Sequence, residues 1–242
     1  MGSTFVDQLA GTFDAYTWAY ILVVIAFLAA LIAQARVKYT YSRFDKVMSR
    51  RGLTAEQAAA EVLRSYGIYD VEIRPIAGNL TDNFNPKTKI ISLSEATYGH
   101  SSIAAIGVAC HEAGHAAQHA QGYVPIKIRN AIIPVCNLGS RLGIPLALVG
   151  MFIPNDAGRL MIIIGLALYA FVALFQFATL PVELDASHRA LKVINETQIL
   201  TDDERKGARQ VLVAAAMTYV VAIATALADL FRMIVLLNGR KD

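Results

Sequence analysis

The stretch "YTWAYILVVIAFLAALIAQA", residues 16–35, decides the fold because no charged side chain interrupts it before Arg36. Its length matches the roughly 20 residues that a helix needs to cross the hydrocarbon core of a bilayer. Three further apolar runs follow at residues 132–153, 160–180 and 211–237. With 55% hydrophobic and 17% charged residues and a mean hydropathy of +0.45, the sequence predicts a multi-pass helical membrane protein.

The run at residues 132–153 is the least regular of the four. It contains the polar side chains of Asn137, Ser140 and Arg141, and Pro145 interrupts it. A membrane crossing is the first interpretation, and a buried or re-entrant helix is the alternative.

The distribution of charge predicts the orientation. Asp7 and Asp14 are the only charges before the first run, and no basic region resembling a signal peptide precedes it, so we expect the first helix to remain as an anchor. Basic residues follow the run at Arg36, Lys38, Arg43, Lys46, Arg50 and Arg51. The positive-inside rule then places segments 36–130 and 181–210 in the cytoplasm. The basic residues suit lipid headgroups, and nucleic acid is not an expected partner.

The cytoplasmic segments predict a small α+β part. The expected elements are a helix from Thr54 to about Gly67, a strand within residues 69–78, a hairpin turning at 85–88 into a strand at 89–93, and a helix from Ser101 or Ser102 to Gly122. The last helix opens with Thr201 and Glu204 as a capping box. The predicted fold is mainly α, as one integral-membrane domain over residues 1–242. Cys110 and Cys136 lack CxxC spacing and are expected to be buried free thiols.

The motif "HEAGH", residues 111–115, carries the chemistry. On a helix, His111 and His115 lie one turn apart, about 5.4 Å along the axis, so both imidazoles can bind one cation. Glu112 can then take a proton from a metal-bound water whose pKa the ion lowers, as in zinc peptidases. Unpaired imidazoles would be costly in this apolar setting. The alternative is a pair of structural histidines bonded to backbone.

A catalytic zinc site needs a third protein ligand. His119 lies on the same helix but about 9 Å further along the axis, and Gly122 stands where the motif HExxHxxGxxH has its last histidine. We therefore expect His119 to line the pocket, to support a ligand, or to be structural.

Glu183 is the better third ligand because it follows the third apolar run and shares the compartment of the HExxH motif. Pro181 suits the first turn of a helix carrying it. Asp185 lies about 200° around that helix, so Asp185 and Arg189 are expected to support the ligands. The alternative is that Glu183 pairs with Arg189 or Lys192.

Four blocks of the chain resemble the bacterial neutral zinc metallopeptidases of the YugP type. They are "GNLTDNFNPKTKIISLS" (78–94), "AAIGVACHEAGHAAQHAQGYVPIKIRNAIIPVCNLGS" (104–140), "FQFATLPVELDASHRAL" (175–191) and "AAAMTYVVAIATAL" (214–227). The resemblance implies a gluzincin-like peptidase of the bacterial cell membrane that binds Zn²⁺ through His111, His115 and Glu183, with Glu112 as base. Ser187 departs from the aspartate of related gluzincins.

The same resemblance suggests how a peptide or protein substrate is held. Gluzincins hold peptides along a sheet edge, which Asn83 to Pro86 or Lys89 to Leu93 would provide here; an ordinary two-stranded ribbon is the alternative. The candidate donors to the oxyanion are His188, Arg189, Tyr123 and Tyr219.

The sequence thus predicts a zinc-dependent endopeptidase in the bilayer, with its site near the cytoplasmic face, that cleaves membrane or membrane-adjacent proteins. Two other functions stay open. One is a scaffold or regulator that zinc stabilises without turnover. The other is a transporter that uses Asp229 and Arg232, although a snorkelling ion pair is the simpler interpretation of those residues.

Overall fold

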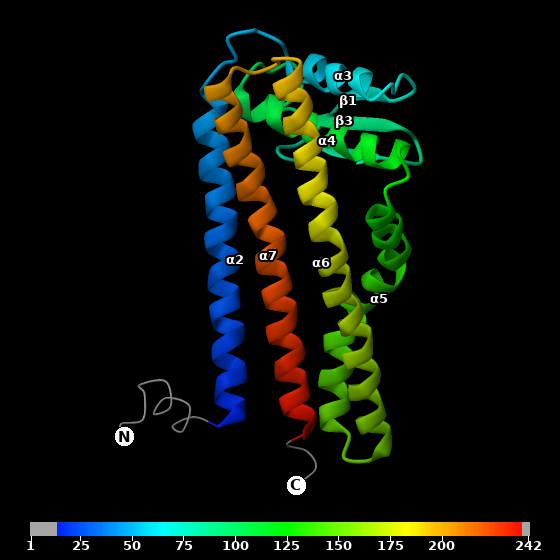
Figure 1. Ribbon diagram of the computed structural model, residues 1–242. Coiled ribbons are helices and arrows are strands. Elements are labelled where there is room, and N and C mark those ends of the chain that lie inside the picture. Colours follow the sequence, from blue (N-terminus) through cyan, green and yellow to red (C-terminus); the bar gives the residue numbers. More distant parts are fainter. Residues whose placement is uncertain (1–13, 239–242) are drawn as a thin grey trace, which may run out of the picture. The chain divides into compact units, whose positions relative to one another are not determined.

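The computed structural model describes residues 14–238, so Asp7 and both chain ends lie outside the described residues. Its elements (Figure 1) are α2 (Ala15–Asp45), α3 (Ala55–Ser65), β1 (Glu72–Ile76), β2 (Asn83–Asn85), β3 (Ile90–Ser94), α4 (Ile103–Ala120), α5 (Val124–Phe152), α6 (Asp156–Glu196) and α7 (Asp202–Asn238). The expectation of a mainly α protein with a small α+β part is confirmed.

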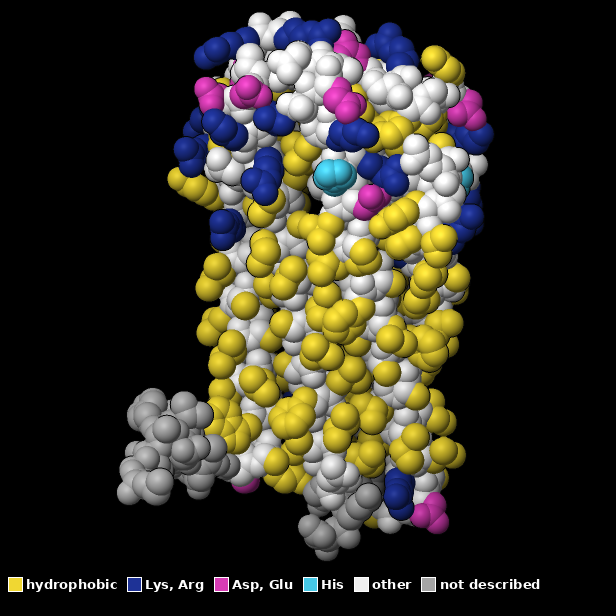
Figure 2. All heavy atoms as spheres, in the orientation of Figure 1, with side chains coloured by type: hydrophobic (Ala, Val, Ile, Leu, Met, Phe, Trp, Pro, Cys, Tyr) yellow, Lys and Arg dark blue, Asp and Glu magenta, His cyan; other side chains and the backbone are white. Residues whose placement is uncertain are grey.

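Four of these helices are long and apolar enough to cross a membrane: α2, α5, α6 and α7. Large side chains on them are exposed, among them Ile32 at 69% and Phe27 at 59%, and hydrophobic side chains cover the visible surface of the long helices (Figure 2). Such a surface suits lipid and not water. Because α5 is continuous over 29 residues despite Pro134 and Pro145, it favours the crossing interpretation of residues 132–153.

The chain divides into two compact units. The first comprises the described residues of Met1–Ile32, Arg129–Phe177 and Val220–Asp242, and the second comprises Ala33–Ile128 and Ala178–Tyr219. Every residue of the predicted metal site belongs to the second unit.

The first unit packs its helices through glycine. A Cβ on Gly139 would lie 2.2 Å from the Leu168 carbonyl oxygen, and a Cβ on Gly165 would lie 2.5 Å from the Gly143 carbonyl oxygen. Close backbone approach is the usual way for apolar helices to associate in lipid. Nearby, Asp229 pairs with Arg232 at 2.8 Å.

The second unit has a core of small and branched side chains from α3, α4, β3 and α6. At the start of α3, the Gln57 side chain accepts a hydrogen bond from the Thr54 amide at 3.1 Å. α7 opens similarly, with Glu204 Oε2 accepting from the Thr201 amide at 2.8 Å. Both cysteines are free and buried, as expected.

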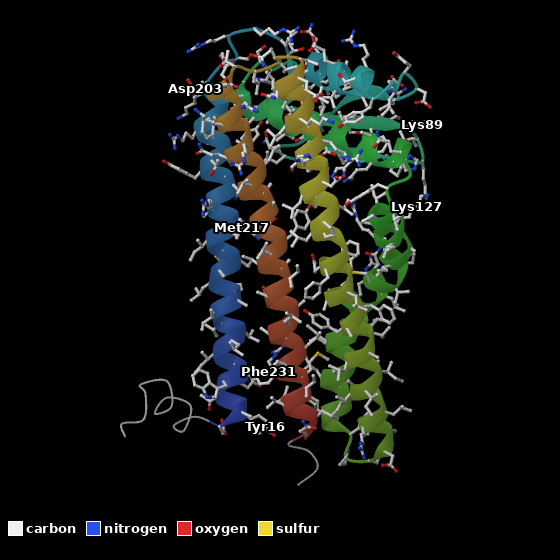
Figure 3. All side chains as sticks on the ribbon, in the orientation of Figure 1. Tyr16, Lys89, Lys127, Asp203, Met217 and Phe231 are labelled. Atoms are coloured by element: carbon white, nitrogen blue, oxygen red, sulfur yellow. The ribbon has the colours of Figure 1, made fainter. Side chains whose placement is uncertain are left out.

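The sheet has the order β1-β3-β2, with β1 parallel and β2 antiparallel to β3. The predicted hairpin is therefore present. One predicted edge is wrong: of residues Lys89 to Leu93, all but Lys89 belong to the central strand β3, which pairs with a strand on each side. Lys89, labelled in Figure 3, directly precedes that strand. Among residues 14–238, β1 and β2 are the edge strands of this sheet.

The predicted start of a helix at Pro181 is also wrong. α6 runs without a break from Asp156 to Glu196, with Pro181 inside it. A proline removes one helical hydrogen bond and crowds the preceding turn, but helices of membrane proteins tolerate it where neighbouring groups compensate. One helix therefore carries both an apolar run and Glu183.

Candidate metal centre

The helix α4 supplies the two histidines. The Ser102 hydroxyl caps it by accepting from the Ala105 amide at 3.1 Å, and in turn donates to Asp45 Oδ1 at 2.8 Å. Most of α4 is buried, including His115 at 9% exposure. Its many alanines and glycines leave little side-chain bulk between this helix and its neighbours.

A close approach of backbones brings α4 to α6. A Cβ on Gly114 would lie 2.4 Å from the Ala186 carbonyl oxygen, a distance that real Cβ atoms do not show. Gly114 directly precedes His115, and Ala186 lies three residues after Glu183. This contact therefore fixes the position along the two helices at which the His115 imidazole and the Glu183 carboxylate meet.

His111, His115 and Glu183, here called the metal cluster, offer three ligand atoms within 4.8 Å of one another. Glu183 Oε2 lies 3.3 Å from His111 Nε2 and 3.6 Å from His115 Nε2. Tetrahedral ligands about 2.0–2.2 Å from zinc lie about 3.3–3.6 Å apart. The donor set and its spacing therefore fit one tetrahedral zinc ion.

The Glu112 carboxylate sits beside the metal cluster without joining it. Glu112 is 8% exposed. Within residues 14–238, no hydrogen bond to its carboxylate is found. Burial raises the pKa of Glu112, although the charges of His111 and His115 act in the opposite direction. A carboxyl group with a raised pKa is a better proton acceptor near neutral pH.

Each imidazole has a second contact through its other nitrogen. His111 Nδ1 lies 3.0 Å from Ser187 Oγ, and His115 Nδ1 lies 3.0 Å from Gln118 Oε1. Ser187 is the residue that departs from the aspartate of related enzymes, and it still reaches the ligand. The sequence analysis missed Gln118. Its place three residues after His115 puts the two side chains on one face of a helix, but this spacing is too common to indicate a role.

Asp185 and Arg189 lie near the metal cluster but bind each other. Arg189 Nε donates to Asp185 Oδ2 at 2.5 Å, and the guanidinium also donates to Gln121 and stacks over the Tyr123 ring at 5.4 Å. Lys192 pairs with Glu196. The alternative in which Arg189 or Lys192 pairs with Glu183 is therefore wrong.

The other predicted residues lie in different surroundings. His119 is exposed, with its ring 6.1 Å from that of Phe84. His188 is exposed and lines a groove with Lys192, whereas Asn83 lies on β2 and donates to the Thr81 carbonyl at 2.9 Å. Tyr219 is half-buried on α7.

Comparison with known proteins gives two matches. A family model described as "Putative neutral zinc metallopeptidase" matches residues 19–238, a range that includes the metal cluster and Glu112. The chain is also similar to "Putative membrane protease YugP" of Bacillus subtilis (strain 168), with 39% identity over 212 residues that cover 87% of this chain and 92% of that protein. No solved structure matches.

Proposed function

This chain belongs to the zinc metallopeptidase family whose model it matches, and on that premise we propose that it is a membrane endopeptidase that cleaves membrane or membrane-adjacent proteins. Its cofactor is Zn²⁺, and it is a membrane protein with a peptide substrate. The observation that carries the proposal is the convergence of His111, His115 and Glu183 at zinc-ligand spacing beside the buried Glu112.

In the proposed reaction, the metal cluster holds the ion and Glu112 moves the proton. Bound zinc supplies Lewis acidity that makes a water nucleophilic near neutral pH. Glu112, which the burial of its side chain makes more basic, accepts the proton of the attacking water and passes it to the leaving amine. The peptide bond between carbonyl carbon and nitrogen breaks, and one water is consumed.

The proposed substrate path runs beside β2. This strand pairs with β3 on one side only, so its other edge can add an extended peptide through main-chain hydrogen bonds. Asn83 belongs to this strand, and Phe84 faces His119 of the zinc-site helix α4. Extended segments of substrate are therefore the form expected to bind.

The proposed location of the reaction is near the cytoplasmic surface of the bacterial cell membrane. Glu183 lies three residues after the apolar run that ends at Leu180, about 5 Å along the helix. The basic residues after the first span support the cytoplasmic side. A site at this depth suits scissile bonds close to a membrane surface.

Three proteins purified in detergent test the proposal: the wild type, Glu183→Ala and Glu112→Gln. Zinc content is measured by mass spectrometry and cleavage with a quenched fluorescent peptide library. We expect near-stoichiometric zinc in the wild type and in Glu112→Gln, little zinc in Glu183→Ala, and a loss of cleavage of about 10²–10⁴-fold in Glu112→Gln.

Two results would contradict the proposal. Equal zinc in the wild type and Glu183→Ala would remove Glu183 from the site. Full cellular function of Glu112→Gln, with function lost only when zinc is lost, would instead establish the zinc-stabilised scaffold.

A further inference from the structure

We infer that Gln118 is a positioning residue that fixes which ring nitrogen of His115 is free to bind the metal. The inference rests on the proposed zinc site and names a residue that neither the motif nor the family match singles out. Gln118 is fully buried, at 0% exposure, between α4 and α6. A long amide side chain in such a place must satisfy all of its polar atoms.

The contacts of Gln118 determine the orientation of its amide. Its Nε2 lies 2.7 Å from the Val182 carbonyl oxygen and 2.8 Å from Asp185 Oδ2. A carbonyl oxygen and an ionised carboxylate only accept hydrogen bonds. Both amide hydrogens are therefore used, and a flipped amide would set oxygen against two oxygens.

The remaining amide atom, Oε1, lies 3.0 Å from Nδ1 of His115. Because this oxygen can only accept, Nδ1 must carry the proton. The neutral imidazole then presents an unprotonated Nε2, the atom that lies 3.6 Å from Glu183 Oε2 in the metal cluster. Gln118 thus selects the tautomer that binds zinc through Nε2.

Asp185 holds this amide in place. Its Oδ2 accepts from both Gln118 Nε2 and Arg189 Nε, so this oxygen acts as an acceptor on the Gln118 side. A chain of hydrogen bonds therefore leads from α6 through Gln118 to His115. This gives Asp185, which is not a member of the metal cluster, a specific task.

The other ligand has no such constraint. Ser187 Oγ lies 3.0 Å from His111 Nδ1, but a hydroxyl can donate or accept. Ser187 therefore leaves both tautomers of His111 possible. Loss of Gln118 should consequently weaken zinc binding more than loss of Ser187.

The test compares the zinc dissociation constants of full-length variants in detergent, measured by competition with a chromogenic chelator. Gln118→Met keeps the length of the side chain and removes its hydrogen bonds, and we expect zinc to bind about 10–100-fold more weakly. We expect a smaller loss for Ser187→Ala. Gln210→Met, at an exposed position on α7, is the matched control and should bind zinc as the wild type does.

A measurement on the wild type covers the case in which Gln118→Met does not fold. With ¹⁵N-labelled histidine, two-bond ¹H–¹⁵N correlation spectra of the zinc-loaded protein in micelles distinguish the tautomers. We expect a protonated Nδ1 and a zinc-bound Nε2 for His115. A zinc-bound Nδ1 would overturn the inference.

The outcomes separate this inference from the proposed function. A wild type that binds no zinc contradicts the proposed function. A wild type that binds zinc, together with a folded Gln118→Met that binds it equally well, contradicts only the role of Gln118. A folded variant with weakened zinc affinity but the wild-type melting temperature of the metal-free protein excludes a merely structural role.

Discussion

At the level of single residues, the contacts of individual oxygen and nitrogen atoms distinguish the side chains of the candidate site. One carboxylate oxygen of Glu183 faces both imidazoles, and the second nitrogen of each imidazole is held by a neutral side chain. For the Glu112 carboxylate, by contrast, no hydrogen-bond partner is found in the described part of the chain. The proposed ligands and the proposed base thus differ in their contacts as well as in their place in the motif.

Tyr219→Phe is predicted to lower kcat while leaving zinc content unchanged. Tyr219 is half-buried on α7 in the unit that holds the metal cluster, and its hydroxyl is one of the candidate donors to the oxyanion. An oxyanion donor contributes about 10²–10³-fold to kcat, so a loss of that size is expected in steady-state kinetics.

Tyr69→Phe is the control for this prediction. Tyr69 is 81% exposed and is not a candidate donor, so kcat is expected to equal that of the wild type. Equal kcat values in the wild type and in Tyr219→Phe would remove Tyr219 from the reaction.

The sequence could supply the residues of the metal cluster but not the contacts that orient them. The HExxH spacing gives His111 and His115, and the position of Glu183 after an apolar run, together with the family resemblance, gives the third residue. Gln118 has no such pattern, since a glutamine three residues after a histidine is common on helices. Its role depends on α6, which only the three-dimensional structure brings beside it.

At the scale of elements, helix packing sets the precision of the site. Gly114→Ala is predicted to weaken zinc binding by at least about tenfold and to destabilise the fold by about 1–3 kcal/mol. The new methyl group would meet the Ala186 carbonyl oxygen at 2.4 Å, so α4 and α6 would have to separate. Chelator competition and thermal melts measure the two effects.

Gly107→Ala is the matched control on the same helix. Its Cβ would lie 3.3 Å from the Ala208 Cβ, a contact that a small shift relieves, and alanine favours helix over glycine by about 1 kcal/mol. Wild-type zinc affinity is expected in this variant. If Gly114→Ala also keeps wild-type affinity, the close approach of α4 and α6 does not set the ligand geometry.

The helices were easier to predict from the sequence than the places where segments begin, end and pair. Apolar length revealed all four candidate spans, but the residue pattern around Pro181 predicted a new helix where α6 continues. The parallel pairing of β1 with β3 was also missed, because alternation along a strand does not specify its partner. Both errors concern how segments join, which local patterns do not encode.

At the scale of the whole molecule, the orientation in the membrane is a prediction that labelling can test. Lys87 lies in the turn between β2 and β3, Pro154 lies between α5 and α6, and both are exposed. A membrane-impermeant maleimide added to intact cells should label Pro154→Cys and leave Lys87→Cys unlabelled. In permeabilised cells, both variants should be labelled.

The wild type provides the background for this experiment. Cys110 and Cys136 are buried, and burial raises the pKa of the Cys110 thiol, which lowers its reactivity further. If only Lys87→Cys is labelled in intact cells, the predicted orientation is wrong and the site lies outside the cytoplasm.

The distance in sequence between the ligands affects how the protein is made. His111 and Glu183 are 72 residues apart, and α5 together with the apolar run of α6 lies between them. During translation the histidines emerge first, and the metal cluster is complete only once Glu183, which follows those two apolar segments, has been synthesised. Under the proposed function, a nascent chain that still lacks Glu183 therefore has no complete zinc site and cannot cleave peptides.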